Sequence, residues 1–533
     1  MARDLQGADL VGRDVVCLVT VSFAGREWLF STAPVEVTSR DGTETRHFHG
    51  GLQTPEIEET LAGIAEVSEP LSVACEVDWP GDLALLQARG HDLASAEAEV
   101  ALYTTGAWED RQVMVRGSCR KPAYGALGEP VVFSVEANTY DDGALLPPST
   151  ARVTPTTYPS APDEAELLYY PIPIGSPGAY TSQDGTSGTT SGSPALVVAR
   201  SGADATKLLI ALGEVEATSV LIFDSTTSES FSVTTEEDGL GRLVSVVDLS
   251  SASTIDVTED EFWVGWNNGG GILKRDRSGP IELGGDLLEW AFEQSTLQVD
   301  RGRMAAAKPL LNRYKFADFI ETQTSPWDWV KLRLLPVLPM TLVVGPDGVY
   351  PLVWRLDATA EESLEHVVVR PGITRVAPVR AYWDERDLRN ELRFEYAFRQ
   401  KKERPKRVLT YAGNANTAAD EQRGNLIAEL SFRRHGTRAK TFKLENVYDD
   451  ATIGKIAADQ LRLRGLAHRV TVYQVGPRLA RLAPGSLVLW SDAELSIERQ
   501  LAVIERRRWL PVGAQLRVLF LEDPVRDGRA SAA

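Results

Sequence analysis

Hydrophobic and polar residues alternate along much of the chain with the period of two that predicts half-buried β-strands. Near the N-terminal end, this pattern or an apolar β-branched run marks residues 15–21, 71–77, 98–104, 112–119 and 131–136 as strands. The segment 80–90 (PGDLALLQARG) has proline near its start and glycine at its end, which is typical of a short helix. We therefore expect a first β domain over residues 1–142 with one helix.

The middle of the chain contains two further units. Residues 146–162 are proline-rich, and 175–194 are rich in Gly, Ser and Thr. The latter stretch predicts a surface loop, since it lacks the lysine of a phosphate-binding loop. Short strands then recur about every ten residues, which predicts an inserted β domain over 143–275. Helical patterns at 285–295, 305–312 and 324–336, followed by a hairpin at 341–355, predict a mixed helical domain over 276–365.

The last unit, residues 366–533, repeats the element order of the first. An alternating strand at 392–399 precedes a helix that Asp449 and Asp450 cap and Gly465 ends. Strands follow at 468–475, 486–490, 500–509 and 515–521. The fold class is therefore mainly β, or α+β overall, with two similar tube-like β-barrel or sandwich domains at the two ends of the chain.

Composition and charge narrow the class of protein. The chain has 533 residues, 43% hydrophobic and 25% charged, which is ordinary globular composition. It has no apolar run of membrane-spanning length and no apolar segment typical of a secretory signal, so we expect synthesis in the cytosol. Three cysteines (Cys17, Cys75 and Cys119) fall on predicted strands, where buried thiols are the expected state.

The net charge of -19 is unevenly distributed. From residue 371 to the end there are 30 Lys and Arg against 20 Asp and Glu, a balance of +10, which leaves -29 for residues 1–370. Such a division predicts that the two parts face different neighbours or meet on assembly. The basic residues are mostly scattered through strands, which argues against a nucleic-acid-binding protein.

The chain contains no strong catalytic or metal-binding motif. His47 and His49 could share one strand face, but no further ligand lies at zinc spacing, so a polar hairpin face is the better interpretation. The motifs of zinc peptidases, serine hydrolases and dinucleotide-binding folds are absent. Trp263 and Trp266 could line a sugar site, although tryptophans in β proteins are more often core residues. We expect no catalytic residue, no cofactor and no metal, and this negative search favours an assembly protein over an enzyme.

Several stretches resemble tail-tip (baseplate) hub proteins of long-tailed siphophages, which are related to the central hub of contractile-phage baseplates. The resemblance lies in strand and turn patterns spread over nearly the whole chain. They are 99–106 (EVALYTTG) with 111–118 (RQVMVRGS), 146–159, 170–178 (YPIPIGSPG), 325–329 (SPWDW), 344–351 (VGPDGVYP), 390–397 (NELRFEYA), 447–452 (VYDDAT), 482–486 (LAPGS) and 520–524 (FLEDP).

The resemblance implies a structural virion protein that forms a homotrimeric hub at the distal end of a tail. Two tube-like domains per chain would adapt a sixfold tail tube to a threefold tip and frame the DNA exit channel. The implied partners are distal tail or tail tube proteins above, a tape measure protein in the lumen, and a tip fibre or spike protein below. DNA would pass without specific binding, and assembly would take place in the host bacterial cytoplasm. The alternatives are a host-recognition protein that binds cell-surface carbohydrate, or a cell-wall-degrading tail enzyme.

The charge division suggests where chains would meet. An attractive contact would join the basic last tube-like domain of one chain to the first tube-like domain of the next, which lies in the acidic part. The candidate contacts on the basic side are Arg433, Arg434, Arg438, Lys440, Arg506, Arg507 and Arg508, for which solvated strand faces are the alternative.

Overall fold

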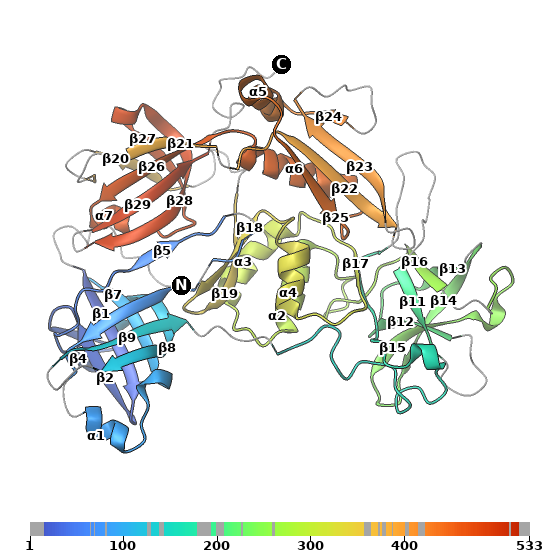
Figure 1. The fold of residues 1–533 in the computed structure, drawn as a ribbon, viewed down its shortest axis with the longest axis horizontal. Helices are drawn as coiled ribbons and strands as arrows, with labels where there is room; N and C mark the ends of the chain where they lie inside the picture. Colours follow the sequence, from blue (N-terminus) through green and yellow to red (C-terminus); the bar gives the residue numbers. More distant parts are fainter. Residues whose placement is uncertain are drawn as a thin grey trace.

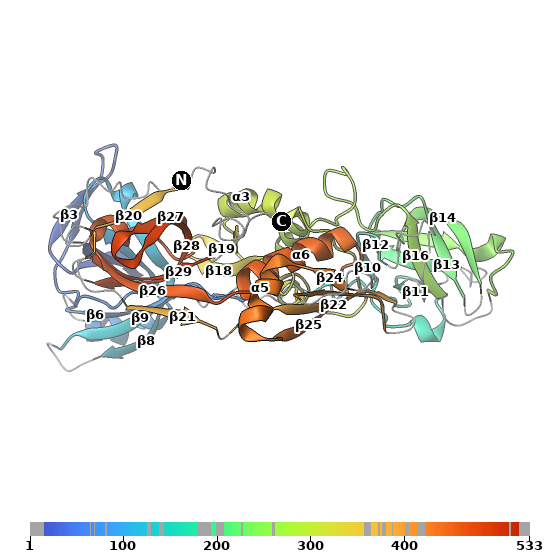
Figure 2. The same cartoon turned by 90° about the horizontal axis from the view of Figure 1, so that it is seen from above.

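A computed structural model describes most of the chain between residues 15 and 521. The described ranges are 15–63, 66–68, 70–79, 83–124, 129–137, 143–177, 193–198, 207–224, 227–257, 262–355, 364–370, 374–375, 380–385, 387–399, 404–413, 422–510 and 513–521. Figure 1 shows an arch, with the N-terminal sheet (blue) below the C-terminal sheet (red) at one end, helices (yellow) at the centre and a barrel (green) at the other end. Seen from above, these units form one long row (Figure 2).

The N-terminal sheet has the strand order β2-β1-β7-β8-β9-β6 and carries the short helix α1. Its elements are β1 Val16–Phe23, β2 Arg26–Ser31, β6 Ser72–Val77, α1 Leu83–Ala88, β7 Glu97–Tyr103, β8 Gln112–Tyr124 and β9 Val131–Ala137. A hairpin of β3 (Val35–Thr38) and β4 (Thr45–Phe48) lies beside it. The strands and the helix predicted for this region are confirmed, and Cys17, Cys75 and Cys119 are buried free thiols in its core.

Residues 49–53 connect the two outer strands of this sheet. The Ser31 amide donates to the His49 carbonyl over 2.8 Å, and the Leu52 amide donates to the Ser31 carbonyl over 3.1 Å. Leu52 also forms an antiparallel bridge with Val77 of β6. The sheet is therefore curled, with one short segment bridging β2 and β6.

The C-terminal sheet has the order β20-β27-β28-β29-β26-β21. Its elements are β20 His366–Val369, β21 Arg380–Asp384, β26 His468–Val475, α7 Pro477–Ala480, β27 Leu487–Asp492, β28 Ile497–Leu510 and β29 Gly513–Phe520. In both sheets a strand is followed by a short helix and a three-strand meander whose last strand pairs back with the first: β6-α1-β7-β8-β9 and β26-α7-β27-β28-β29. All of these pairings are antiparallel.

The repeat extends to irregularities in the ladders. The long middle strand of each meander, β8 and β28, has a register shift with each of its meander neighbours. Such shifts bend a strand and increase its twist, which lets a long strand follow a curled sheet. The repeats differ beyond this unit, because β1 joins β7 antiparallel whereas β20 joins β27 parallel.

The helix that corresponds to α1 is α7 and not the helix expected from the sequence. That longer helix, α6 (Asp450–Arg464), belongs to a separate sheet of order β24-β23-β22-β25, inserted between β21 and β26. The other elements of this insertion are β22 Glu391–Arg399, β23 Arg404–Ala412, β24 Gln422–Gly424, α5 Leu426–His435 and β25 Ala439–Leu444. The range 366–533, for which the sequence predicts a second tube-like domain, therefore contains two sheets in the described residues.

The inserted domain is a closed barrel of order β11-β12-β15-β14-β13-β16. Its strands are β11 Ser193–Val197, β12 Lys207–Leu212, β13 Ser219–Phe223, β14 Ser228–Glu237, β15 Leu243–Asp248 and β16 Phe262–Asn268. Buried Val, Ile and Leu side chains from alternate positions fill it, together with Trp266. The short β strands predicted here are confirmed in the described residues.

The central unit combines helices with a hairpin. Its elements are β10 Ile172–Ile174, which pairs with β17 Asp318–Ile320, the helices α2 Gly284–Glu293, α3 Arg301–Leu311 and α4 Pro326–Trp329, a π-helical turn Val330–Leu334, and the hairpin β18 Met340–Gly345 and β19 Gly348–Val353. Ser325 caps α4 as its sequence predicts, since its Oγ accepts from the Asp328 amide over 3.0 Å.

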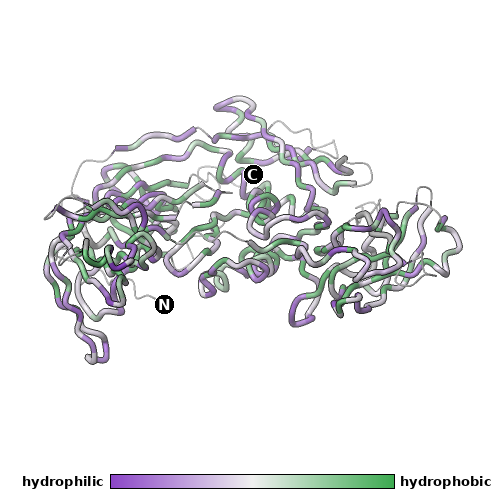
Figure 3. Tube along the Cα trace, turned by 60° about the horizontal axis from the view of Figure 1, so that its bottom comes forward, coloured by the Kyte–Doolittle hydropathy of each residue, from purple (hydrophilic) through white to green (hydrophobic). Residues whose placement is uncertain are grey.

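One apolar core joins this central unit to the β22–β25 sheet. It runs from Leu287 and Leu338 in the central unit to Phe394 on β22 and Ile456 on α6. In Figure 3, hydrophobic segments (green) recur through the central unit and the sheets around it. Burying this much apolar surface is the main stabilising term, so the central unit and the sheet are expected to unfold together.

Asp286 anchors the exit of the barrel onto the central helices. Its buried carboxylate lies 2.7 Å from Lys274 Nζ, in the segment leaving the barrel, and 2.9 Å from Lys308 Nζ on α3. Burial opposes ionisation, but hydrogen bonds and charge interactions with the two lysines lower the pKa of Asp286 below its usual value.

We predict that Asp286→Asn lowers the free energy of unfolding at pH 7 by about 2–3 kcal/mol, because it leaves Lys274 without its buried partner. A pKa lowered by folding gives stability that is present above the unfolded pKa of about 3.9 and lost as the pH falls through the folded pKa. Urea unfolding of variant and wild type from pH 7 to pH 3 should therefore converge at the acid end. Asp163→Asn, at an exposed site, is the control; a pH-independent difference would contradict this account.

Candidate functional site: surfaces for assembly

Three of the predicted contact residues, Arg506, Arg507 and Arg508, lie on β28 and face acidic residues of the same chain. The strand β5 (Glu58–Thr60), from the N-terminal region, pairs antiparallel with β28 at this point. The resulting ion pairs are Arg506–Glu58 at 3.2 Å, Arg507–Glu59 at 2.5 Å and Arg508–Glu56 at 2.6 Å. The attraction between basic and acidic parts that was expected between chains is thus formed within one chain at these three arginines.

Arg507 is the buried member of this set. Its side chain is 0% exposed, its Nη1 donates to the Ala480 carbonyl over 3.0 Å, and its guanidinium lies 4.7 Å from the Trp509 ring centre. Backbone bonds extend the pairing on both sides, from the Leu61 amide to Glu505 and from the Trp509 amide to Ile57. A charge in this position is favourable only while Glu59 is paired with it.

The other four predicted residues gather on what we call the α5–β25 surface, made of Arg433, Arg434, Arg438 and Lys440. Arg433 and Arg434 lie in the last turn of α5, where cations interact favourably with the helix dipole. Arg433 pairs with Glu429 over 2.5 Å, whereas Arg434 and Arg438 are exposed to solvent.

Lys440, on this surface, lies close to other positive charges. It lies on β25, which among the described strands pairs only with β22 and so forms the edge of its sheet. Burial and the positive charges of Arg464 and Arg389 lower the pKa of Lys440. The cations of this region therefore repel one another, and an acidic partner would relieve that repulsion.

A third surface was missed by the sequence analysis. The strand β21 carries Tyr382 and Trp383, whose side chains are 45% and 57% exposed. Two neighbouring aromatic residues in an otherwise charged segment, 380–387, were the available signal. Nothing in the local sequence shows, however, that this strand lies at the margin of a sheet.

The structure places His47 on β4 and His49 directly after it. His47 Nδ1 lies 3.1 Å from Glu36 across the β3–β4 hairpin, at an exposed position. No group of three or more His, Cys, Asp or Glu side chains in the described part of the chain could hold a metal ion. Burial raises the pKa of Cys17 and Cys119 to about 12, which suppresses thiolate formation.

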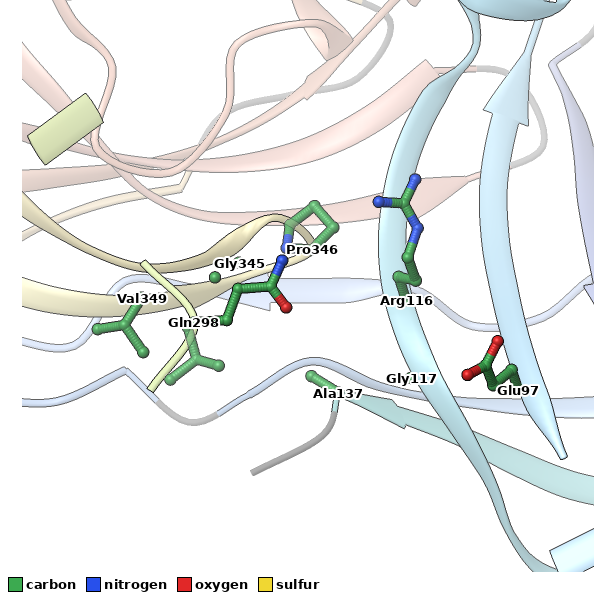
Figure 4. Close-up of a pocket in the computed structure, with 10 residues that line it drawn as sticks. Glu97, Arg116, Gly117, Ala137, Gln298, Gly345, Pro346 and Val349 are labelled. Carbon is green, nitrogen blue, oxygen red and sulfur yellow. The ribbon is translucent and has the colours of Figure 1, made fainter. Parts of the chain in front are cut away.

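The hollows of the surface lie at seams between units. A cavity of about 220 Å³ separates β8 from the β18–β19 hairpin, and Figure 4 shows Arg116 of β8 directed towards this hairpin. A larger groove of about 860 Å³ is lined by β5, β8 and the same hairpin. Its charged groups are largely paired with each other, as in Arg116–Asp347 at 3.3 Å and Arg507–Glu59, so it has the character of a domain junction.

Comparisons with known proteins give distant structural similarities. No protein-family model and no curated protein matches the chain. The chain is similar to the tail protein from Neisseria meningitidis MC58, at 11% identity and a TM-score of 0.38, over 96% of this chain and 97% of that chain. It is similar to the prophage MuSo2 43 kDa tail protein from Shewanella oneidensis, at 9% identity and a TM-score of 0.35, over 96% and 99% of the two chains.

A further similarity is to the prophage tail protein gp18 from Listeria monocytogenes EGD-e, at 8% identity and a TM-score of 0.30, over 96% of each chain. At these identities and TM-scores no residue correspondence with these proteins follows. In the described residues, no helix combines the length and the apolar character needed to cross a membrane.

We predict that Arg507→Leu and Arg508→Leu have clearly different effects. Removing buried Arg507 leaves Glu59 without its partner and should lower the free energy of unfolding by about 3 kcal/mol. Removing the more exposed Arg508 should cost less than about 1 kcal/mol. Denaturant unfolding measures both values, and hydrogen exchange should show loss of protection at residues 57–61 only in Arg507→Leu. Equal destabilisation would contradict the central role of Arg507.

Proposed function

We propose that the protein is a structural component of a phage tail that forms a trimeric hub at the distal tip. The observation that carries the proposal is the repeated unit β6-α1-β7-β8-β9 and β26-α7-β27-β28-β29 within one chain. Three chains with two such sheets each would present six similar sheets, which suits a junction between sixfold and threefold parts of a tail. The sequence resemblance to tail-tip hub proteins supports the same function.

The chemistry of the described residues also favours association over catalysis. The paired acids Asp449 and Asp450 are occupied structurally, since Asp449 caps α6 and Asp450 is paired with Arg407 at 2.8 Å. The described residues offer two exposed surfaces for contact: a basic helix end with its edge strand, and an aromatic edge strand. We infer that binding of other chains is the function.

In this proposal the chain contacts tail tube or distal tail proteins above it and a fibre or spike protein below it. A tape measure protein occupies the lumen before DNA passes through. A wall rich in Lys and Arg would retain DNA by displacing its counterions, so the channel wall should be acidic or neutral. The segment 1–370, with its net charge balance of -29, is the part of the chain suited to that wall.

A carbohydrate-binding role is the second candidate, and one observation bears on it. Trp266 is buried within the barrel at 1% exposure, so it cannot stack against a sugar without opening the barrel. Trp263, half-buried on β16, remains as a possible stacking surface. Of the two tryptophans that the sequence suggested, only the half-buried Trp263 is therefore available at this site.

We expect the purified protein to form trimers, or rings whose mass is a multiple of three chains. Mass photometry and sedimentation equilibrium over a range of concentrations measure this directly. A chain of 58.3 kDa makes the monomer, dimer and trimer easy to separate. A monomer at every concentration tested would exclude the hub proposal.

The α5–β25 surface allows a test of the electrostatic part of the proposal. Reversing Arg434 and Arg438 to glutamate together should slow trimer formation at least tenfold at low salt, because opposite charges steer encounter and like charges oppose it. Circular dichroism should not change, since both side chains are exposed. The control is Arg275→Glu, an exposed charge next to the barrel. If both proteins assemble at the wild-type rate, this surface is not the contact.

A further inference from the structure

The strand β21 forms an edge of the C-terminal sheet in the described structure. In the strand order of its sheet β21 is terminal, and β26 is its neighbour among the described strands. Arg380, Ala381, Tyr382 and Trp383 are all exposed. Natural proteins usually blunt such an edge, because its free N–H and C=O groups can pair with another strand.

The residue types on β21 are those that dominate binding energy at protein interfaces. Arg, Tyr and Trp are enriched among interface hot spots, and here they occupy three of the five positions of one exposed strand. The side chain of Trp383 is 57% exposed, whereas large aromatic side chains usually bury most of their surface. Among the described residues, this edge thus combines an outer side without a paired strand with exposed aromatic surface.

The sequence of β21, Arg-Ala-Tyr-Trp-Asp, is complementary to itself in the antiparallel direction. If two copies of β21 pair with their central residues opposed, Arg380 of each chain faces Asp384 of the other. Ala381 then faces Trp383, a small residue opposite a large one, and Tyr382 faces its own copy. Opposed residues in an antiparallel pair lie on the same face, so each pairing is a side-chain contact.

We propose that the β21 edge binds the β21 edge of a second copy of this chain, in an antiparallel, two-fold symmetric strand pair. A two-fold contact uses the same patch on both chains and closes on itself. It therefore joins two chains, or two trimers, and is separate from the contacts that would close a trimer. The Asp384 carboxylate lies 3.6 Å from Nη2 of Arg517 on β29, two strands inward in the same sheet. In the strand pair Asp384 would therefore interact with Arg517 of its own chain and with Arg380 of the second copy.

The other margins of the sheets do not offer the same contact. In the N-terminal sheet, residues 49–53 bridge the outer strands β2 and β6. The edge strand β25 carries Lys440 and Lys443 and follows Arg438. Positive charges of this kind on an edge strand repel a second copy of the same strand. The edge strand β20 exposes His366 and Val368 but no acid–base pair that would be matched in a two-fold arrangement.

The test uses two single charge reversals and their mixture. In Arg380→Asp, two aspartates face each other at both ends of the strand pair, and in Asp384→Arg two arginines do. Each variant alone should raise the dissociation constant of the β21 contact at least tenfold. Mixed in equal amounts, they should restore association to within about threefold of wild type, because every opposed pair is again oppositely charged. Analytical ultracentrifugation over a wide concentration range, with circular dichroism as the folding control, measures all four samples.

Cross-linking provides a second, independent measurement. Cys17, Cys75 and Cys119 are buried, so a cysteine introduced on β21 is the reactive thiol of the described chain. Tyr382→Cys lies on the two-fold axis and should give a disulfide-linked dimer under mild oxidation, whereas Ala381→Cys faces Trp383 and should not. Failure of the mixture to restore association, or equal cross-linking at both positions, would overturn the proposal. If none of the four β21 variants changes the two-fold self-association of the chain, the proposal is overturned as well, whereas normal trimer formation by these variants would leave the hub proposal intact.

Discussion

The pairing of β5 with β28 is the contact on which the arrangement of the two repeated sheets depends. It joins residues more than four hundred positions apart and is centred on Arg507, a fully buried cation held by Glu59 and by the Ala480 carbonyl. A buried ion pair is costly to form and far more costly to break on one side, so it specifies a partner more than it adds stability. The strand β27 pairs with residues 497–503 of β28, and β5 pairs with residues 506–508 further along the same strand. A strand from the N-terminal region therefore completes the C-terminal sheet.

The segment after β5 extends this constraint into the central unit. The Thr341 hydroxyl donates to the Gly63 carbonyl over 2.9 Å and accepts from Trp354 Nε1 over 2.9 Å, and Val67 bridges to Leu342 on β18. One short stretch of chain thus touches the C-terminal sheet and the central hairpin before it enters β6. These contacts tie the N-terminal sheet to both the C-terminal sheet and the central hairpin. The ion pairs between β28 and residues 56–59 also neutralise part of the charge difference between the two ends of the chain.

Local periodicity predicted most of the strands and the central helices, because half-buried strands and capped helices leave two-residue and 3.6-residue patterns. It failed where the decisive contact is distant. The helix 450–464 has a clear apolar face and matched the expected element order, but that face packs in the core shared with the central unit. The helix that corresponds to α1 is the four-residue α7, which is too short to show a helical period. The sequence Gly476-Pro477 was the only local signal of a helix start there. The pairing of Arg506–Arg508 with β5 was equally invisible, since charge alone cannot tell a partner in the same chain from one in another.

The two repeats carry the same pairing pattern but end differently, so their margins present different strand edges. The strands of β6-β9-β8-β7 and β26-β29-β28-β27 pair in the same order, and β28 pairs additionally with β5. What varies is the strand added at each margin. Residues 49–53 bridge the margins of the first sheet, whereas β20 and β21 end the second one with unpaired outer sides in the described structure. An open strand edge avoids unwanted pairing either through charged side chains or by being covered. The lysines of β25 correspond to the first case, and the exposed aromatic residues of β21 to the second. The first discourages pairing with its own copy and attracts acidic surfaces, while the second gains from being covered.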